Sequence, residues 1–127
     1  MGDTARRQGR SSIRREDAGC VITEHWISAR QPYSGRSLNI YDRESQHWEQ
    51  YWVDSTGTRV HFVGGPIENG LQIATTEPVS SAGPTPAYSR ITLTRNPDCT
   101  VLQLGETSPD GEAWTTSYAF IYRPHAE

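Results

Sequence analysis

The chain has 127 residues and a mass of 14.2 kDa, enough for one domain with a single hydrophobic core. Its net charge is −3, from 15 acidic and 12 basic residues, so it lacks the basic footprint of a nucleic-acid-binding protein. A membrane span needs about 18 consecutive apolar residues, and no run in the sequence comes close to that length. No run forms the hydrophobic core of a signal peptide either. We expect a cytoplasmic protein that binds neither nucleic acid nor membrane, with a flexible basic tail over residues 1–8.

Hydrophobic residues alternate with a period of two along almost the whole chain, which predicts β-strands. Turn sequences such as "DRES", "DSTG", "ENG" and "SPDG" separate the strands and favour consecutive hairpins. The prolines of the longest connection, residues 77–87, exclude a helix there. The predicted strands are 10–16, 20–26, 37–41, 47–53, 59–63, 71–75, 89–94, 100–106 and 114–122.

We therefore predict an all-β fold, an antiparallel up-and-down meander of about eight or nine strands. Closing such a sheet into a barrel removes its exposed edges, and a barrel of about eight strands has room for side chains or one small ligand. The barrel domain is expected to span residues 9–123, followed by a short C-terminal tail over 124–127.

The stretch "HWEQYWVD" places Trp48, Gln50 and Trp52 on one face of a strand. Burial favours an inward position for the indole rings, and Gln50 then lies among them as a buried polar group. Such polar groups bond to each other, to trapped water or to a ligand. The candidate ligand-binding residues on this reasoning are Glu24, Trp26, Asn39, Trp48, Gln50, Trp52, Gln103, Trp114 and Tyr118.

Several segments together resemble the DUF1579-type bacterial domains of unknown function, which are similar to lipocalin-like (calycin) barrels. They are "GRSLNIYD", "HWEQYWVDSTG", the pair Gly64–Gly65, "RITLT", "LQLGETSPDGEAWT" and "IYR". The resemblance runs from about Gly19 to Arg123. It implies an up-and-down barrel, but it brings no established activity and no catalytic residue.

The chain departs from that family pattern in two ways. The usual first strand, of the type W-x-G-x-W, does not precede residue 9, which predicts a barrel that is incomplete at its N-terminus. The open strand edge in turn predicts a homodimer. Leu93 and Gly105 stand where relatives tend to carry Trp, which predicts an enlarged cavity if either position faces inward.

We expect the barrel to bind a small hydrophobic or aromatic molecule. One alternative is an isomerase, cyclase or lyase that uses Glu24 as acid or base, assisted by His61 or Tyr118. Another is a barrel that serves protein association without a ligand. We expect no metal and no cofactor: Cys20 and Cys99 belong to no zinc motif, and no two histidines are spaced to share a metal or haem. The histidines considered as haem ligands are His25, His47, His61 and His125.

Overall fold

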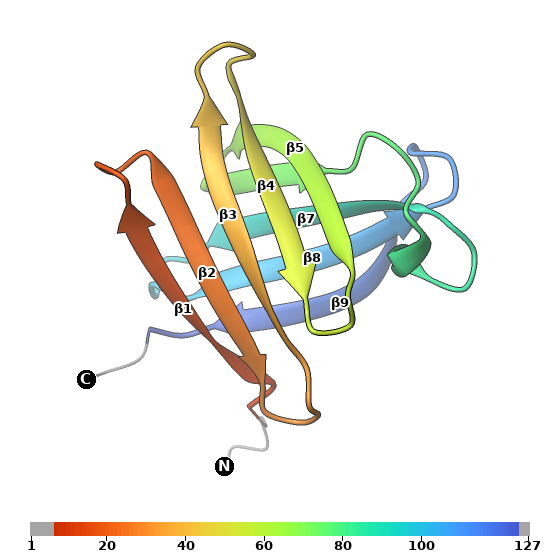
Figure 1. Ribbon diagram of the computed structural model, residues 1–127, viewed down its shortest axis with the longest axis horizontal. Coiled ribbons are helices and arrows are strands. Elements are labelled where there is room, and N and C mark those ends of the chain that lie inside the picture. The colour runs from red at the N-terminus through yellow and green to blue at the C-terminus, as the bar shows by residue number, and fades with distance from the viewer. Residues whose placement is uncertain (1–6, 125–127) are drawn as a thin grey trace.

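The computed structural model describes residues 7–124 and confirms the predicted all-β meander (Figure 1). Within these residues, nine antiparallel strands form one sheet in which each strand pairs with its neighbours in sequence. The strands are β1 (Gly9–Glu16), β2 (Val21–Ser28), β3 (Ser34–Asp42), β4 (His47–Asp54), β5 (Arg59–Ile67), β6 (Gly70–Ala74), β7 (Tyr88–Arg95), β8 (Val101–Ser108) and β9 (Thr115–Tyr122).

The sheet curls into a half-barrel and leaves two edges. Strands β7, β8 and β9 lie behind β1 to β4 and cross them in Figure 1. Within residues 7–124, β1 pairs only with β2 and β9 only with β8, so no ladder closes the barrel. The predicted incomplete barrel therefore corresponds to a strongly curved open sheet.

Aspartate side chains shape several of the tight connections. Asp42, Asp54, Asp98 and Asp110 each accept a hydrogen bond from a backbone N–H two residues further along. Such local bonds stabilise a turn without help from the rest of the fold. The turn sequences therefore form turns through hydrogen bonds within the turn itself.

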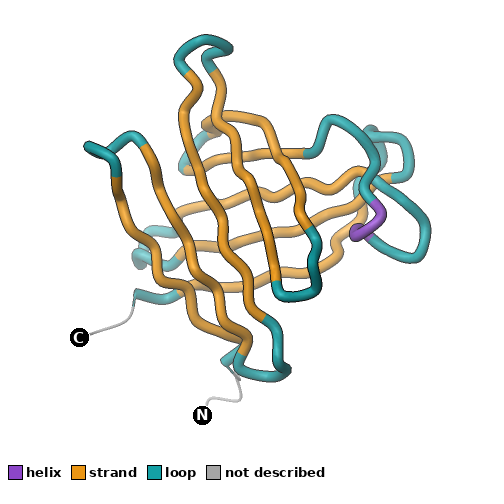
Figure 2. Tube along the Cα trace, in the orientation of Figure 1, coloured by secondary structure: helices purple, strands orange, loops and turns teal. Residues whose placement is uncertain are grey.

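The connection between β6 and β7 is the longest, as Figure 2 shows. It contains the 3-10 turn Ser80–Ala82 and an isolated bridge between Val79 and Ala87. With the start of β5 it borders an open cleft of about 790 Å³. Among the described residues there is no helix of the length and apolar character needed to span a bilayer.

The concave face of the sheet holds the core. Phe62 and Ile73 are the described hydrophobic side chains that are almost completely buried, at 5% and 2% exposure. Aromatic rings lie against glycines of the adjacent strand, where a Cβ atom would overlap the ring. The pairs are Trp26 with Gly9, Trp52 with Gly35, and Tyr118 with Gly105. Glycine is needed at these positions because only a hydrogen leaves room for the ring.

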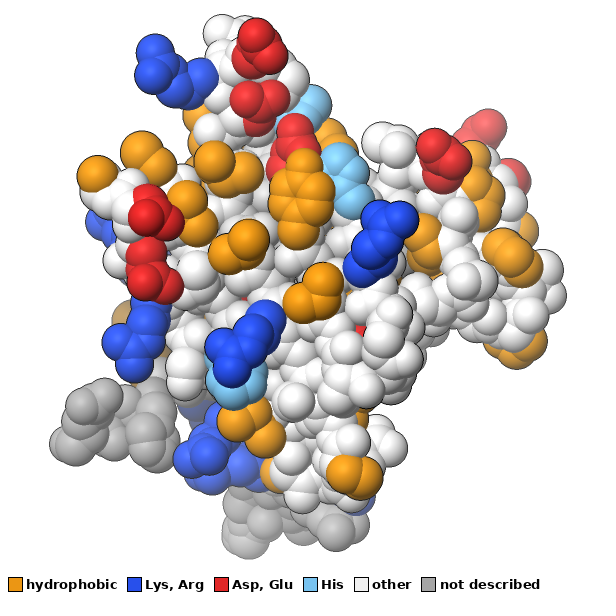
Figure 3. All heavy atoms as spheres, viewed as in Figure 1, with side chains coloured by type: hydrophobic (Ala, Val, Ile, Leu, Met, Phe, Trp, Pro, Cys, Tyr) orange, Lys and Arg blue, Asp and Glu red, His pale blue; other side chains and the backbone are white. Residues whose placement is uncertain are grey.

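The convex face remains largely in contact with solvent. Leu38, Ile40, Tyr51 and Val53 point outward from β3 and β4 and are between 37% and 54% exposed. Figure 3 shows hydrophobic side chains on this side as separate spots among charged groups and histidines. The sheet is therefore a single layer whose buried hydrophobic side chains lie on one face.

Candidate functional site

A chain of polar side chains crosses the concave face from β4 to β1. Gln50 Nε2 donates to Asn39 Oδ1 at 2.8 Å, and Asn39 Nδ2 donates to Ser37 Oγ at 3.0 Å. Ser37 Oγ then donates to Glu24 Oε1 at 3.1 Å, and Ser11 Oγ donates to Glu24 Oε2 at 2.5 Å. The cross-strand register explains the chain, because Gln50 lies opposite Asn39 and Glu24 lies opposite Ser37.

Glu24 is the charged end of this chain. The ion pairs found among the described residues are His47–Glu49, His61–Glu49 and Arg90–Glu106, and Glu24 takes part in none of them. Its carboxylate is half-buried and is held by two neutral hydroxyl groups. A carboxylate in this setting lacks the positive partner that usually accompanies a charge removed from water.

Aromatic rings from β2, β9 and the β2–β3 connection cluster near this carboxylate, whose charge acts on two of them. Trp26 stacks on Phe120 across the half-barrel, with ring centroids 6.0 Å apart and an interplanar angle of 13°. Tyr118 and Tyr122 flank Phe120 at 5.0 Å and 6.3 Å, and Tyr33 meets Trp26 edge-on. All five rings are only half-buried, so part of the aromatic surface stays accessible to solvent.

Burial and the charge of Glu24 both affect the pKa values of two tyrosines in the site. Burial, reinforced by the charge of Glu24, raises the pKa of Tyr122 to about 12, although a hydrogen bond with Ser11 opposes the shift. Burial also raises the pKa of Tyr118; the hydrogen bond from Gln103, 2.9 Å long, opposes it, and the charge of Glu24 adds to it. Both hydroxyls are therefore neutral near pH 7 and close enough to Glu24 to sense its charge.

A second carboxylate lies at the lower end of β4. Asp54 accepts hydrogen bonds from Tyr33 Oη at 2.8 Å and Trp52 Nε1 at 3.0 Å. Burial alone would raise the pKa of Asp54, but the bonds from Thr56, Tyr33 and Trp52 outweigh it and lower the pKa to about 2. This carboxylate anchors the end of the hairpin between β4 and β5 and keeps the Trp52 ring in place.

The structure places eight of the nine predicted ligand-binding residues on the concave face. The register puts Trp48, Gln50 and Trp52 on the same side as Glu24, Trp26 and Asn39, and Gln103 beside Tyr118. Trp48 is at the far end of the β3–β4 hairpin, where its ring meets that of Tyr41.

The placement of Trp114 on the inner face with Tyr118 was wrong. Trp114 precedes β9, and its ring lies under the guanidinium of Arg90, 4.2 Å from the ring centroid. Arg90 points to the convex side and pairs with Glu106 at 3.0 Å. The register shift between Gly105 and Glu106 breaks the period of two on which the prediction depended.

Two further predictions need correction. His61 lies on the convex face, bound to Glu49 at 2.7 Å, so it cannot assist Glu24 in catalysis. Gly105 faces inward, but the ring of Tyr118 occupies the space above it, so the predicted enlargement of the cavity does not occur there. Of the other haem candidates, His25 is also on the convex face, and His125 is outside the described residues.

Sequence reasoning missed part of the site. Ser37 shares its strand face with Asn39, so its inward position could have been found from parity alone. Phe120 and Tyr122 share the face of Tyr118 in the same way. Ser11 carries no such signal, because its contact with Glu24 depends on the register between β1 and β2.

Comparisons with known proteins add nothing to this picture: no family model, no curated protein and no solved structure matches the chain. The lipocalin-like resemblance of the sequence therefore stays a prediction, and the site has to be interpreted from its own geometry.

Proposed function

We propose that the concave face of the half-barrel binds a small hydrophobic or aromatic molecule that carries a positively charged group. The aromatic rings of β2 and β9 supply an accessible apolar surface of the kind that lines small-molecule sites. A few convergent polar groups orient a ligand in such sites, and the chain from Gln50 to Glu24 offers them.

The observation that carries the proposal is the carboxylate of Glu24, which has no ion-pair partner among the described residues. An ionised carboxylate accepts about four hydrogen bonds, and the two serine hydroxyls use only two of these positions. A ligand ammonium group would complete the set with a charge-assisted bond. The neighbouring rings would add cation–π attraction, worth about 0.5–2 kcal/mol depending on how well water is excluded.

Native against denaturing mass spectrometry of freshly purified protein is the first experiment. Extra mass that disappears on denaturation would reveal a co-purified ligand, and its value would begin to identify it. The expected ligand contains an amine or a similar donor. A bound molecule that is an anion would contradict the proposal.

A titration with matched probes tests the role of Glu24 directly. Naphthylethylamine and the neutral naphthylethanol share an aromatic body, and the fluorescence of Trp26 and Trp52 should report both. We expect the amine to bind more tightly, and Glu24→Gln to weaken it about tenfold or more while leaving the alcohol unchanged. Equal affinities for the two probes, or an unchanged amine affinity in Glu24→Gln, would rule the proposal out.

Glu49→Gln is the matched control for this titration, because Glu49 is a carboxylate on the opposite face of the sheet. The same variants separate binding from catalysis. If Glu24 were the acid or base of an isomerase, cyclase or lyase, Glu24→Gln would abolish turnover and preserve binding of the neutral probe.

A second candidate function is self-association through the β9 edge. Strand β9 contains no charged residue and no proline, and its outer edge has no strand partner within residues 7–124. Strand β1, the other edge, carries Arg10, Arg14, Arg15 and Glu16, and charges of this kind protect an edge from pairing. We therefore propose that a homodimer forms by antiparallel pairing of two β9 strands.

Light scattering across micromolar concentrations tests the dimer. Ile121 is 51% exposed on β9, and Ile121→Lys should shift the equilibrium towards the monomer by placing like charges at the shared edge. Ile13→Lys, at an exposed position on β1, is the control and should leave the equilibrium unchanged. A wild-type protein that is monomeric throughout would contradict the proposal.

A further inference from the structure

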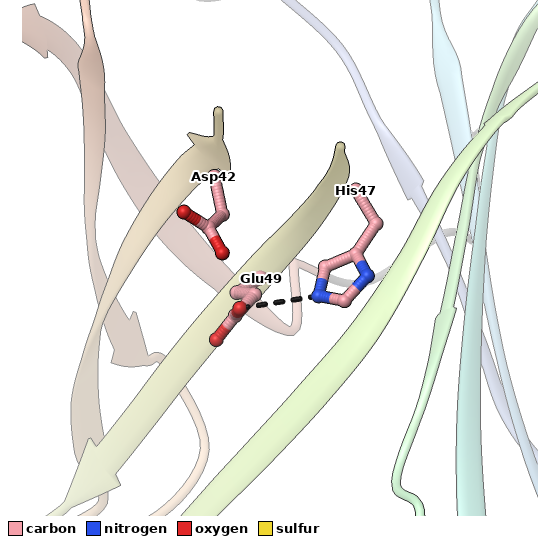
Figure 4. Close-up of side chains that lie close together, drawn as sticks. All are labelled: Asp42, His47 and Glu49. Atoms are coloured by element: carbon pink, nitrogen blue, oxygen red, sulfur yellow. Dashed lines mark hydrogen bonds and ion pairs between the residues drawn. The ribbon is translucent and has the colours of Figure 1, made fainter. Parts of the chain in front are cut away.

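We propose that Asp42, His47 and Glu49, at the end of the β3–β4 hairpin, bind one divalent transition-metal ion on the convex face. The three side chains are drawn in Figure 4. The proposal is independent of the ligand site, because the two sites are on opposite faces of the sheet.

The strand register brings the three groups together. Asp42 and His47 lie directly opposite each other in the ladder, and Glu49 follows His47 by two positions on the same face. One ligand atom from each residue falls within 4.8 Å of the other two. His47 Nε2 and Glu49 Oε2 are 3.2 Å apart, close to the roughly 3 Å that separates two ligands each bound about 2.1 Å from the same metal.

Two neighbouring side chains hold Glu49 in position. Tyr51 Oη donates a hydrogen bond to Glu49 Oε1 at 2.7 Å, and His61 Nε2 lies 2.7 Å from the same oxygen. The Tyr51 and His61 rings stack with centroids 4.5 Å apart and an angle of 11° between them. Because both contacts use Oε1, the other oxygen, Oε2, faces His47. Partners of this kind orient the ligands in known metal sites.

The ligand types select the class of metal. Imidazole nitrogen is a favourable ligand for Zn²⁺, Co²⁺, Ni²⁺ and Cu²⁺, whereas Mg²⁺ and Ca²⁺ prefer all-oxygen sites. Asp42 also caps the hairpin turn through Ser45, at 2.6 Å, but each carboxylate oxygen has a second lone pair available. The sequence alone predicted no metal site, because 42, 47 and 49 match no known ligand spacing and only the hairpin register brings them together.

Isothermal titration calorimetry of tag-free protein with ZnCl₂ tests the proposal, with MgCl₂ as the comparison. We expect one Zn²⁺ per chain and at least tenfold weaker binding of Mg²⁺. His47→Ala should weaken Zn²⁺ binding at least tenfold, and Tyr51→Phe, which removes only a supporting hydroxyl, about tenfold. The absorption spectrum of added Co²⁺ gives a second readout of ligand number.

His25→Ala is the matched control, since His25 lies on the same face but is outside the cluster. It should leave the Zn²⁺ affinity unchanged. Equal loss in His25→Ala and His47→Ala, or no measurable Zn²⁺ binding by the wild type, would overturn the proposal. If His47→Ala does not fold, Glu49→Gln and Tyr51→Phe decide the question in the same way.

Discussion

Glu24 and Glu49 lie two strands apart in one sheet, and their surroundings differ because they face opposite sides of it. Glu24, on the concave face, is held by Ser11 and Ser37 and has no positive partner among the described ion pairs. Glu49, on the convex face, contacts two histidines and a tyrosine. This difference is the basis of the two proposals, which are a positively charged ligand for the concave carboxylate and a metal ion for the convex one.

The comparison also concerns packing, since the two faces contribute unequally to stability. The concave face holds Phe62, Ile73 and the rings that cover glycines, whereas the convex face leaves large apolar side chains in water. A half-barrel of a single layer must obtain most of its stability from the concave side. Substitutions at matched positions on the two faces measure this difference.

The largest expected effect is at Phe62. Phe62→Ala removes a ring that is 5% exposed, and we expect the free energy of unfolding to fall by about 3–5 kcal/mol. Val53→Ala, at a position 52% exposed on the convex face, should change it by less than about 0.5 kcal/mol. Urea denaturation of both variants makes the comparison. Similar losses in the two would mean that the convex face is covered in solution.

The next effect is at the glycines beneath aromatic rings. A methyl group at Gly105 would overlap the Tyr118 ring, so Gly105→Ala should destabilise the protein by about 1–3 kcal/mol. At Gly65 a Cβ meets nothing within 4 Å, and Gly65→Ala should be nearly neutral. Thermal unfolding of the two variants is sufficient to compare them. A neutral Gly105→Ala would show that Tyr118 moves freely into the open side of the half-barrel.

A smaller effect is expected at Asp54. Its folded-state pKa of about 2 lies below the value in the unfolded chain, so the stability it supplies is present above about pH 4 and is lost as the pH falls towards 2. Asp54→Asn should lower the free energy of unfolding at pH 7 by the order of 1 kcal/mol, allowing for solvent screening. The difference from wild type should shrink between pH 4 and pH 2 in urea titrations; a constant difference would contradict the assignment.

The smallest effect is expected at Glu49, whose pKa is lowered in the same direction, chiefly by Tyr51 and His61. Its contribution is likewise present above the unfolded-state pKa and is lost as the pH falls through the folded-state value. Glu49→Gln should reduce the acid dependence of stability less than Asp54→Asn, because an exposed network is screened by water. A larger effect in Glu49→Gln would show that the contacts of Glu49 with Tyr51 and His61 are more important for folding than their exposure suggests.

Much of the fold could be predicted from the sequence, because strand alternation and turn residues act locally. The ring-bearing face of β4 followed from the positions of Trp48, Gln50 and Trp52, and the meander followed from the short turns between strands. The same rule failed at Trp114, since a β-bulge between Trp114 and Tyr118 breaks the alternation of faces and leaves no clear mark in the sequence.

The residues that contact the carboxylates of Glu24 and Glu49 could not be predicted from the sequence. Period-two alternation put Glu24 on the same face as Trp26, but only the pairing of β1 with β2 brings Ser11 to its carboxylate. Likewise, His61 reaches Glu49 because β4 pairs with β5 in one particular register. The sequence by itself determined the strands, their turns and which side chains share a face, since these depend on neighbours in the chain. The tertiary structure decided which faces meet, because register and curvature depend on contacts between residues far apart in sequence.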